Sequence, residues 1–301
     1  MTSQCSFSVP GLELYRWRQS AKERAIKKEI PPREVDWLLR EIAGLEPLVL
    51  RLESFKDKPQ IYLKISLKEL EKLWHRRLEE RIPLQYLTGV AYWRNFALKV
   101  TPAVLIPRPE TEDLIDLAIA ARSSTTPADN EHWADLGTGS GAIALGLAEA
   151  LTKAKIYAID SSSEALAIAR ENAENCGLAH RIEFARGYWW EPLDKLKGQI
   201  SGMVANPPYI PSRAIAALQP EVVKHEPHLA LDGGTDGLES IKYLIETAPT
   251  YLRSGGVWLI EMMAGQASAA AELLRSNGNY TQIQIFPDLA GIERFALARR
   301  V

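Results

Sequence analysis

Four consecutive residues, Asn206-Pro207-Pro208-Tyr209, bring together one polar, two rigid and one aromatic side chain. Because proline restricts the backbone, the Asn206 side chain and the Pro207 carbonyl are expected to be held rigidly. Each oxygen can accept one N–H of a planar amide or aryl amine, and two such contacts would aim the weakly nucleophilic nitrogen at a methyl donor. Tyr209 can stack its ring on the flat group. The motif predicts a site for a planar nitrogen substrate, with Asn206, Pro207 and Tyr209 as catalytic residues.

A glycine-rich run, Ala134-Asp-Leu-Gly-Thr-Gly-Ser-Gly-Ala142, lies where a predicted strand leads into a predicted helix. Glycines at such a turn let the backbone bend sharply and let a ligand approach the main chain. A dinucleotide site would have the spacing G-x-G-x-x-G. Here the spacing is G-x-G-x-G, and Asp135 precedes the first glycine. A carboxylate disfavours a pyrophosphate and favours a cationic amino group, so the turn indicates S-adenosyl-L-methionine as the cofactor, with S-adenosyl-L-homocysteine as its product.

A second acid, Asp160, ends the next predicted strand. In nucleotide-binding sheets an acid at this place typically binds ribose hydroxyls. The cofactor site is therefore expected to include Asp135, Asp160 and the glycines Gly137, Gly139 and Gly141.

The region after Thr111 alternates predicted strands with predicted helices. Short apolar runs predict strands at residues 133–136, 155–160, 181–185, 200–205, 257–261, 281–286 and 294–298. The alternation indicates an α/β fold with a seven-stranded, mostly parallel sheet covered by helices on both faces. The last two strands have no helix between them and should pair antiparallel. Because the carboxyl ends of parallel strands share one edge, the glycine turn and the Asn206 loop should face one crevice.

Helix start signals accompany these strands. Helices are expected to begin near Thr111, Gly141, Ser161, Gly237 and Gln266. Ser161 with Glu164 has the spacing of a capping box, in which each side chain bonds a free backbone N–H at the helix start. Gly177 should end that helix.

The N-terminal region instead has the apolar spacing of short helices. One predicted helix carries Val35, Leu38, Leu39, Ile42 and Leu45 on a single face. Another begins with the capping box Ser66 and Glu69 and must end before Pro83. From residue 92 to residue 100 the pattern alternates as in a strand. Residues 101–110 are too rich in proline for a helix or a central strand, so this stretch is interpreted as the connection between two domains.

Composition excludes several classes of protein. Hydrophobic residues make up 46% and charged residues 25%, and the net charge is −2, so there is no surplus of Lys and Arg for a nucleic acid backbone. No apolar run is long enough for a membrane span, and no signal peptide is visible. Cys5 and Cys176 are the two cysteines, which argues against a disulfide framework and favours a reducing cytoplasm. His225 and His228 flank Glu226 without a third ligand at metal spacing, so no metal is expected.

Taken together, these residues resemble the release factor glutamine methyltransferases, the PrmC/HemK family. The resemblance extends over almost the whole chain. Its motifs are P-L-Q-Y-L-T-G at 83–89, I-P-R-P-E-T-E at 106–112, D-L-G-T-G-S-G-A-I-A at 135–144, N-P-P-Y-I at 206–210, D-G-G-T-D-G-L at 232–238 and D-L-A-G-I-E-R at 288–294. N-P-P-Y alone is shared with DNA adenine methyltransferases, whereas I-P-R-P-E-T-E together with the D-G-L segment is more specific.

The resemblance implies a small all-α N-terminal substrate-recognition domain over residues 1–88, a β-hairpin and proline-rich linker over 89–108, and a class I, Rossmann-like methyltransferase domain over 109–301. It implies methylation of the glutamine in the Gly-Gly-Gln motif of class I peptide chain release factors. The enzyme is expected to be a cytoplasmic monomer with no direct nucleic acid or membrane partner. The cofactor site would comprise Asp135, Gly137, Thr138, Gly139, Ser140, Gly141, Asp160, Trp189 and Asn206, and the substrate site Asn206, Pro207, Pro208 and Tyr209.

The chain departs from the family pattern at two places. Tyr188 stands where the family usually has an acid that contacts the adenine, although Trp189 can still pack on the ring. Met263 stands where the family places a glycine, in the loop after Glu261. Three alternatives remain open at this point: a ribosomal-protein glutamine methyltransferase, a DNA adenine methyltransferase and a non-catalytic cofactor-binding protein. Adenine methylation in DNA would require base flipping and a domain that reads the target.

Overall fold

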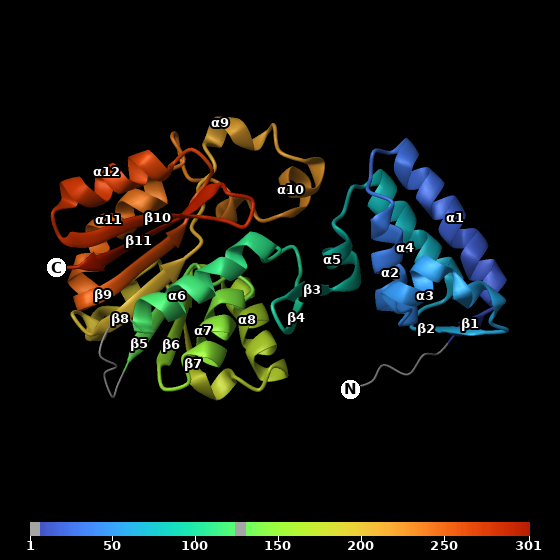
Figure 1. The fold of residues 1–301 in the computed structure, drawn as a ribbon, viewed down its shortest axis with the longest axis horizontal. Helices are drawn as coiled ribbons and strands as arrows, with labels where there is room; N and C mark the ends of the chain where they lie inside the picture. The colour runs from blue at the N-terminus through green and yellow to red at the C-terminus, as the bar shows by residue number, and fades with distance from the viewer. Residues whose placement is uncertain (1–6, 124–130) are drawn as a thin grey trace. The chain divides into compact units, whose positions relative to one another are not determined.

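The computed structural model describes residues 7–123 and 131–301, and Cys5 lies outside these ranges. The chain divides into two compact units, Met1–Gly89 and Val90–Val301, each with its own hydrophobic core (Figure 1).

The N-terminal unit is mainly helical. Ser66 caps α4: its hydroxyl accepts the Glu69 N–H while the Glu69 carboxylate accepts the Ser66 N–H, which confirms the predicted capping box. A short antiparallel sheet of two strands, missed by the sequence prediction, joins the start of this unit to its middle. The elements are β1 (Phe7–Val9), α1 (Gly11–Lys27), α2 (Arg33–Ala43), α3 (Pro47–Leu52), the 3-10 turn η1 (Ser54–Asp57), β2 (Ile61–Leu63), α4 (Leu67–Glu79) and α5 (Leu84–Thr88).

The larger unit is built on a seven-stranded sheet of order β10-β11-β9-β8-β5-β6-β7. The strands β7, β6, β5, β8 and β9 run parallel to one another, and β11 pairs antiparallel with both β9 and β10, which confirms the predicted sheet and the antiparallel final pair. The bounds are β5 (His132–Leu136), β6 (Lys155–Asp160), β7 (Ile182–Arg186), β8 (Ile200–Ala205), β9 (Leu252–Glu261), β10 (Tyr280–Pro287) and β11 (Glu293–Arg300).

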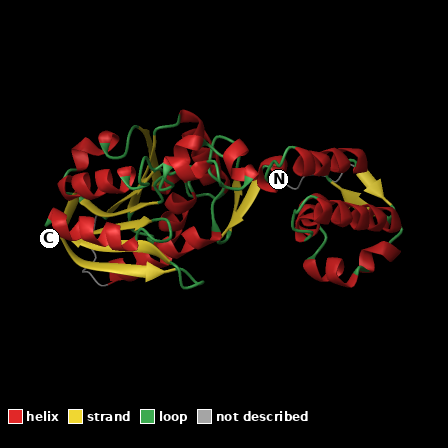
Figure 2. Ribbon diagram, turned by 90° about the horizontal axis from the view of Figure 1, so that it is seen from above, coloured by secondary structure: helices red, strands yellow, loops and turns green. Residues whose placement is uncertain are grey.

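Helices cover both faces of this sheet, because its strands alternate apolar side chains toward two separate cores. The helices α6 (Asp113–Ser123), α7 (Ala142–Ala150) and α8 (Ser163–Asn175) pack on one face, and α11 (Glu239–Tyr251) and α12 (Ala267–Asn277) pack on the other. Figure 2 shows the strands in yellow between red helices. Shorter elements lie in the loops: η2 (Pro109–Glu112), η3 (Ala179–Arg181), η4 (Glu191–Leu196), α9 (Ser212–Ile215), α10 (Pro220–His225) and η5 (His228–Ala230).

One predicted helix start is wrong by a single residue. The cap of α8 is Ser162, whose hydroxyl accepts the Ala165 N–H, rather than Ser161. The strand that directly precedes α8 explains the shift. Asp160, the last residue of β6, accepts the Ser162 N–H and so sets where the helix begins.

The hairpin expected within the connecting segment 89–108 consists of β3 (Val90–Trp93) and β4 (Phe96–Lys99). Trp93, Phe96 and Leu98 are buried in the core of the larger unit, against α6 and α7. The hairpin is therefore an integral part of the larger unit, and it leads directly to the proline-rich loop that reaches the cavity described next.

Candidate functional site

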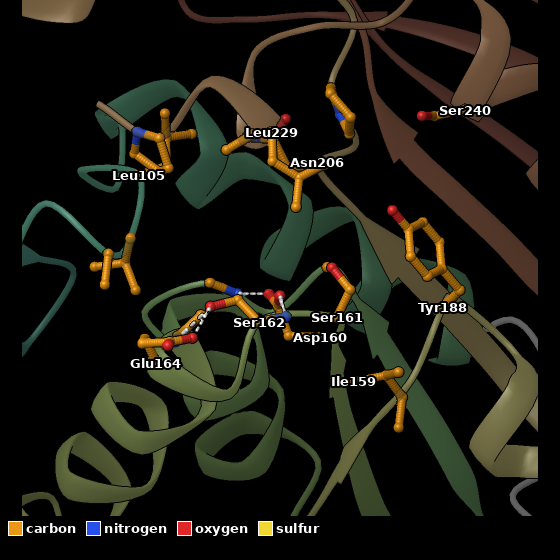
Figure 3. Close-up of a pocket in the computed structure, with 18 of the residues that line it drawn as sticks. Leu105, Ile159, Asp160, Ser161, Ser162, Glu164, Tyr188, Asn206, Leu229 and Ser240 are labelled. Atoms are coloured by element: carbon orange, nitrogen blue, oxygen red, sulfur yellow. Dashed lines mark hydrogen bonds between the residues drawn. The ribbon is translucent and has the colours of Figure 1, made fainter. Parts of the chain in front are cut away.

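A cavity of about 430 Å³ lies at the carboxyl edge of the parallel strands (Figure 3). The loops after β5, β6, β7 and β8 all contribute to its wall, as does the proline-rich loop that follows β4. Six predicted site residues line it: Gly137, Gly139, Asp160, Trp189, Asn206 and Pro208. The expectation that the glycine turn and the Asn206 loop face one crevice is thereby confirmed.

The glycine turn is held against β6 by its own backbone. The N–H groups of Gly137 and Thr138 each bond the Ile159 carbonyl at 2.9 Å. The Gly139 N–H donates to Asp160 Oδ2 at 2.9 Å, and the Ser162 N–H donates to Asp160 Oδ1 at the same distance. Burial raises the pKa of Asp160, while these backbone N–H groups oppose the rise. The result is a rigid carboxylate at the cavity wall whose remaining lone pairs can accept hydroxyl hydrogen bonds.

The start of α7 depends on a glycine conformation. Gly141 has φ +83°, and a Cβ at this position would lie 3.1 Å from Ala169 Cβ on α8. Only glycine combines that backbone with such a close approach of two helices. Gly141 therefore lets the turn pass directly against Ala169 of α8.

Four predicted cofactor residues are not part of the cavity wall: Asp135, Thr138, Ser140 and Gly141. The Asp135 side chain is fully buried, and its Oδ2 accepts the Thr138 hydroxyl at 2.5 Å and the Ala144 N–H at 2.9 Å. Burial raises the pKa of Asp135 to about 7. The geometry gives Asp135 a supporting place under the turn, and its contact with a cofactor amino group stays a prediction.

The Asn206 loop leaves β8 as expected, and hydrogen bonds join it to η2 and to the end of β9. Asn206 faces the cavity from the opposite side to Asp160 (Figure 3) and donates its Nδ2 hydrogen to Thr111 Oγ1 at 3.2 Å. The Tyr209 hydroxyl donates to Glu261 Oε1 at 3.0 Å. Pro207 and Tyr209 are not part of the cavity wall, and the Tyr209 ring packs against the core next to α12. Stacking of that ring on a substrate stays a prediction.

Thr111 and Glu261 form a buried link that sequence reasoning missed. The Thr111 hydroxyl donates to Glu261 Oε2 at 2.7 Å, and both residues are buried. Burial raises the pKa of Glu261, and burial together with the charge of Glu261 raises the pKa of Tyr209. The available signals were Thr111 within I-P-R-P-E-T-E and the position of Glu261 at the end of a predicted strand.

Gln266, at the start of α12, provides a second missed contact. Its Nε2 donates to the Tyr209 and Gly237 carbonyls at 3.0 and 3.1 Å, and its Oε1 accepts the Met263 N–H at 2.9 Å. Met263 is one of the two departures from the family pattern. Its backbone N–H orients the Gln266 side chain, which in turn bonds the Tyr209 carbonyl of the Asn206 loop.

The cavity wall after β7 holds the other departure. Tyr188 lines the cavity and its side chain is largely exposed, while its N–H donates to Glu191 Oε2 at 2.9 Å. Trp189 has φ +49°, and its ring lies against Gly137, where an added Cβ would be 3.4 Å away. Two aromatic side chains therefore flank the end of the cavity that adjoins β7.

In the described part of the chain, no group of three or more His, Cys, Asp or Glu side chains is arranged to hold a metal ion. None of the helices within residues 7–123 and 131–301 is long and apolar enough to cross a membrane.

The chain is similar in sequence to known methyltransferases. A family model described as "Methyltransferase domain" matches residues 127–286. The release factor glutamine methyltransferase of a Synechocystis species is 53% identical, with 97% of each chain covered. Those of Thermosynechococcus vestitus and Prochlorococcus marinus are 49% and 41% identical, over 97% and 100% of this chain and 99% and 100% of their own.

Among solved structures, the hMettl16 catalytic domain in complex with a MAT2A 3'UTR hairpin has a TM-score of 0.55 at 17% identity, covering 68% of this chain and 75% of its own. At that level of identity the likeness concerns the fold alone.

Proposed function

This chain belongs to the release factor glutamine methyltransferase family, and on that premise we propose that it methylates the side-chain amide nitrogen of a glutamine, with S-adenosyl-L-methionine as the methyl donor. The substrate glutamine is that of the Gly-Gly-Gln motif in class I peptide chain release factors. One observation carries the proposal: Asn206 and Pro208 line the same cavity as Gly137, Gly139 and Asp160.

The cavity fits the proposed cofactor. Gly137 and Gly139 leave the main chain open to a ligand, and Asp160 offers a fixed carboxylate for two ribose hydroxyls. Trp189 provides an apolar surface for the adenine, and Tyr188 lies beside it in place of the family's acid. When bound, S-adenosyl-L-methionine supplies a methyl group activated by a positively charged sulfur.

The Asn206 loop is proposed to orient the substrate. The Asn206 Oδ1 and the Pro207 carbonyl each accept one N–H of the glutamine amide, which directs the nitrogen lone pair toward the methyl carbon. The cofactor held by Gly137, Gly139 and Asp160 would supply the methyl group with its sulfur as the leaving group, and the glutamine nitrogen would release one proton to solvent. Positioning supplies most of the acceleration. No strong base is required, because the amide nitrogen becomes acidic once its lone pair is used.

The rest of the chain has proposed roles as well. Residues 1–88 would recognise the release factor, and residues 109–301 would carry the chemistry. Residues 89–108 would connect these two parts, with their hairpin packed in the core of the larger unit. The enzyme would act as a monomer in the cytoplasm without a direct nucleic acid partner. The net charge of −2 supports the last of these, the lack of a direct nucleic acid partner, since nucleic acid binding usually requires clustered positive charge.

Methyl transfer to purified proteins tests the proposal. The chain is incubated with S-adenosyl-L-methionine labelled in its methyl group and with a bacterial class I release factor. Label is expected in the release factor, and none when the glutamine of its Gly-Gly-Gln motif is replaced by alanine. Parallel reactions contain ribosomal proteins or DNA. Label that enters DNA or a ribosomal protein instead, or that persists after the alanine replacement, contradicts the proposed substrate.

A further inference from the structure

We propose that Thr111 and Glu261 are positioning residues that fix which end of the Asn206 amide faces the substrate. Both lie outside the cavity wall, whereas Asn206 is part of it. They would therefore act on the reaction indirectly, through the Asn206 loop that they bond. The inference rests on the proposed function, in which the Asn206 oxygen accepts a substrate N–H.

The three side chains come from distant parts of the chain. Thr111 lies in η2, Asn206 follows β8, and Glu261 ends β9. Asn206 Nδ2 is 3.2 Å from Thr111 Oγ1, which is 2.7 Å from Glu261 Oε2. The Tyr209 hydroxyl occupies the other carboxylate oxygen at 3.0 Å. These three hydrogen bonds form a series, Asn206–Thr111–Glu261–Tyr209. The series connects both ends of the Asn-Pro-Pro-Tyr loop to one buried carboxylate.

Hydrogen-bonding capacity gives this series a direction. The Thr111 hydroxyl donates its single proton to Glu261 Oε2 and the Tyr209 hydroxyl donates to Oε1, so both carboxylate oxygens act as acceptors. The Thr111 oxygen then has only lone pairs to offer Asn206. Asn206 must present its NH₂ group to that oxygen, and its Oδ1 is left for a hydrogen-bond donor in the cavity.

The opposite orientation would defeat the reaction. A reversed Asn206 amide would point its NH₂ at the N–H groups of the substrate amide, placing donors against donors. In water the two orientations would differ little, but here Thr111 and Glu261 are buried, where hydrogen bonds are stronger and an unmade one costs more. Burial of Thr111 and Glu261 therefore increases the free-energy difference between the two orientations of the Asn206 amide.

Substitutions at Thr111 test the direction of the series. Thr111→Val removes the hydroxyl with little change of shape, and Thr111→Ser keeps it. We expect kcat for release factor methylation to fall roughly ten- to hundredfold in Thr111→Val and to stay within about threefold of wild type in Thr111→Ser. The dissociation constant for S-adenosyl-L-methionine should change by less than about threefold in both. Thr247→Val is the matched control, since among the described residues its hydroxyl bonds only the Tyr243 carbonyl, within α11 on the surface.

Glu261→Gln provides an independent variant of the same shape. Because the Tyr209 hydroxyl still donates to the Gln oxygen, the new NH₂ faces Thr111 and donates to it. Thr111 is then free to donate to the Asn206 oxygen, which reverses the amide. We expect a loss of kcat similar to that of Thr111→Val, and no further loss when the two changes are combined, because both act on one interaction.

The outcomes separate the two proposals. If the wild-type chain labels no release factor, the proposed function is wrong. If the wild-type chain is active, and Thr111→Val or Glu261→Gln binds the cofactor normally and retains full kcat, the positioning role alone is wrong. A loss in Thr111→Val that Thr111→Ser does not restore, or additive losses in the double variant, would also overturn it. If Thr111→Val no longer binds the cofactor, Glu261→Gln alone decides the positioning role, and the reverse holds if Glu261→Gln no longer binds it.

Discussion

Arg108 and Glu226 lie 118 positions apart in sequence and form an ion pair in which one guanidinium nitrogen, Nη2, is 2.7 Å from both carboxylate oxygens. The Glu226 side chain is 2% exposed and that of Arg108 is 34% exposed. The pair joins the proline-rich loop after β4 to the loop that follows α10, and both loops line the cavity. Burial raises the pKa of Glu226, and the charge of Arg108 opposes that rise.

This asymmetry in burial predicts unequal costs of breaking the pair. Arg108→Met leaves a buried carboxylate without its partner, whereas Glu226→Gln leaves an arginine that can reach solvent. We expect the free energy of unfolding to fall by about 2 kcal/mol or more in Arg108→Met and by about 1 kcal/mol in Glu226→Gln at pH 7, less than for a fully buried pair. Urea unfolding measures both.

The pH dependence provides a check on that explanation. Without Arg108 the Glu226 carboxyl can become neutral at low pH, so the deficit of Arg108→Met should shrink between pH 7 and pH 5. A deficit that is equal at the two pH values, or larger for Glu226→Gln than for Arg108→Met, would show that the buried charge is not the cause.

The buried Asp135 predicts a pH dependence of stability. Its pKa is about 7 in the folded protein because of burial, against an ordinary value of 3.8, and its Oδ1 has no hydrogen-bond partner among the described residues. Between pH 4 and pH 7 the folded state keeps a proton that the unfolded state has released. The free energy of unfolding should therefore fall as pH rises through this window, by roughly 4 kcal/mol in the limit, and then level off.

Urea unfolding without cofactor at several pH values between 4 and 8 measures this effect. Asp135→Asn has no group that titrates there, so its free energy of unfolding should decline less than that of wild type over the same window. Asp57→Asn, at an exposed site, is the matched substitution. Parallel curves for wild type and Asp135→Asn would refute the assignment of the pH dependence to Asp135.

Asn206 and Asp160 should affect different steps of the proposed reaction. Asn206→Ala removes an acceptor for the substrate and should lower kcat roughly a hundredfold or more while cofactor affinity changes by less than about tenfold. Asp160→Asn weakens charge-assisted hydrogen bonds and should lower cofactor affinity about ten- to hundredfold with a smaller effect on kcat at saturation. Calorimetric titration and single-turnover methyl transfer give the two quantities. Full-speed transfer by Asn206→Ala would rule out the proposed chemistry.

The contact of α7 with α8 predicts that Gly141 tolerates no side chain. Gly141→Ala combines a backbone at φ +83° with a Cβ 3.1 Å from Ala169. Gly278, which ends α12 at φ +77°, has open space around it and serves as the comparison. We expect Gly278→Ala to cost about 1 kcal/mol of unfolding free energy from backbone strain and Gly141→Ala about 2 kcal/mol more. Equal costs in urea unfolding would show that the contact with Ala169 is unimportant.

Much of the fold follows from local pattern. Alternating and continuous apolar runs predicted all seven strands of the large sheet, because the spacing of apolar residues reflects which faces of a strand are buried. The common edge of Gly137 and Asn206 followed from topology alone, since parallel strands must end on the same side. The Ser66 cap could be predicted because both of its partners lie within three residues.

Other features required the tertiary structure. Asp135 is absent from the cavity wall, because its fully buried carboxylate accepts the Thr138 hydroxyl and the Ala144 N–H. Asn206 bonds Thr111 across 95 positions, and Thr111 bonds Glu261 across 150. Residue types and spacing thus determined which groups can do chemistry and at which edge of the sheet they gather. Which group bonds which was decided only by packing, because a buried donor takes whichever acceptor the folded backbone brings within about 3 Å.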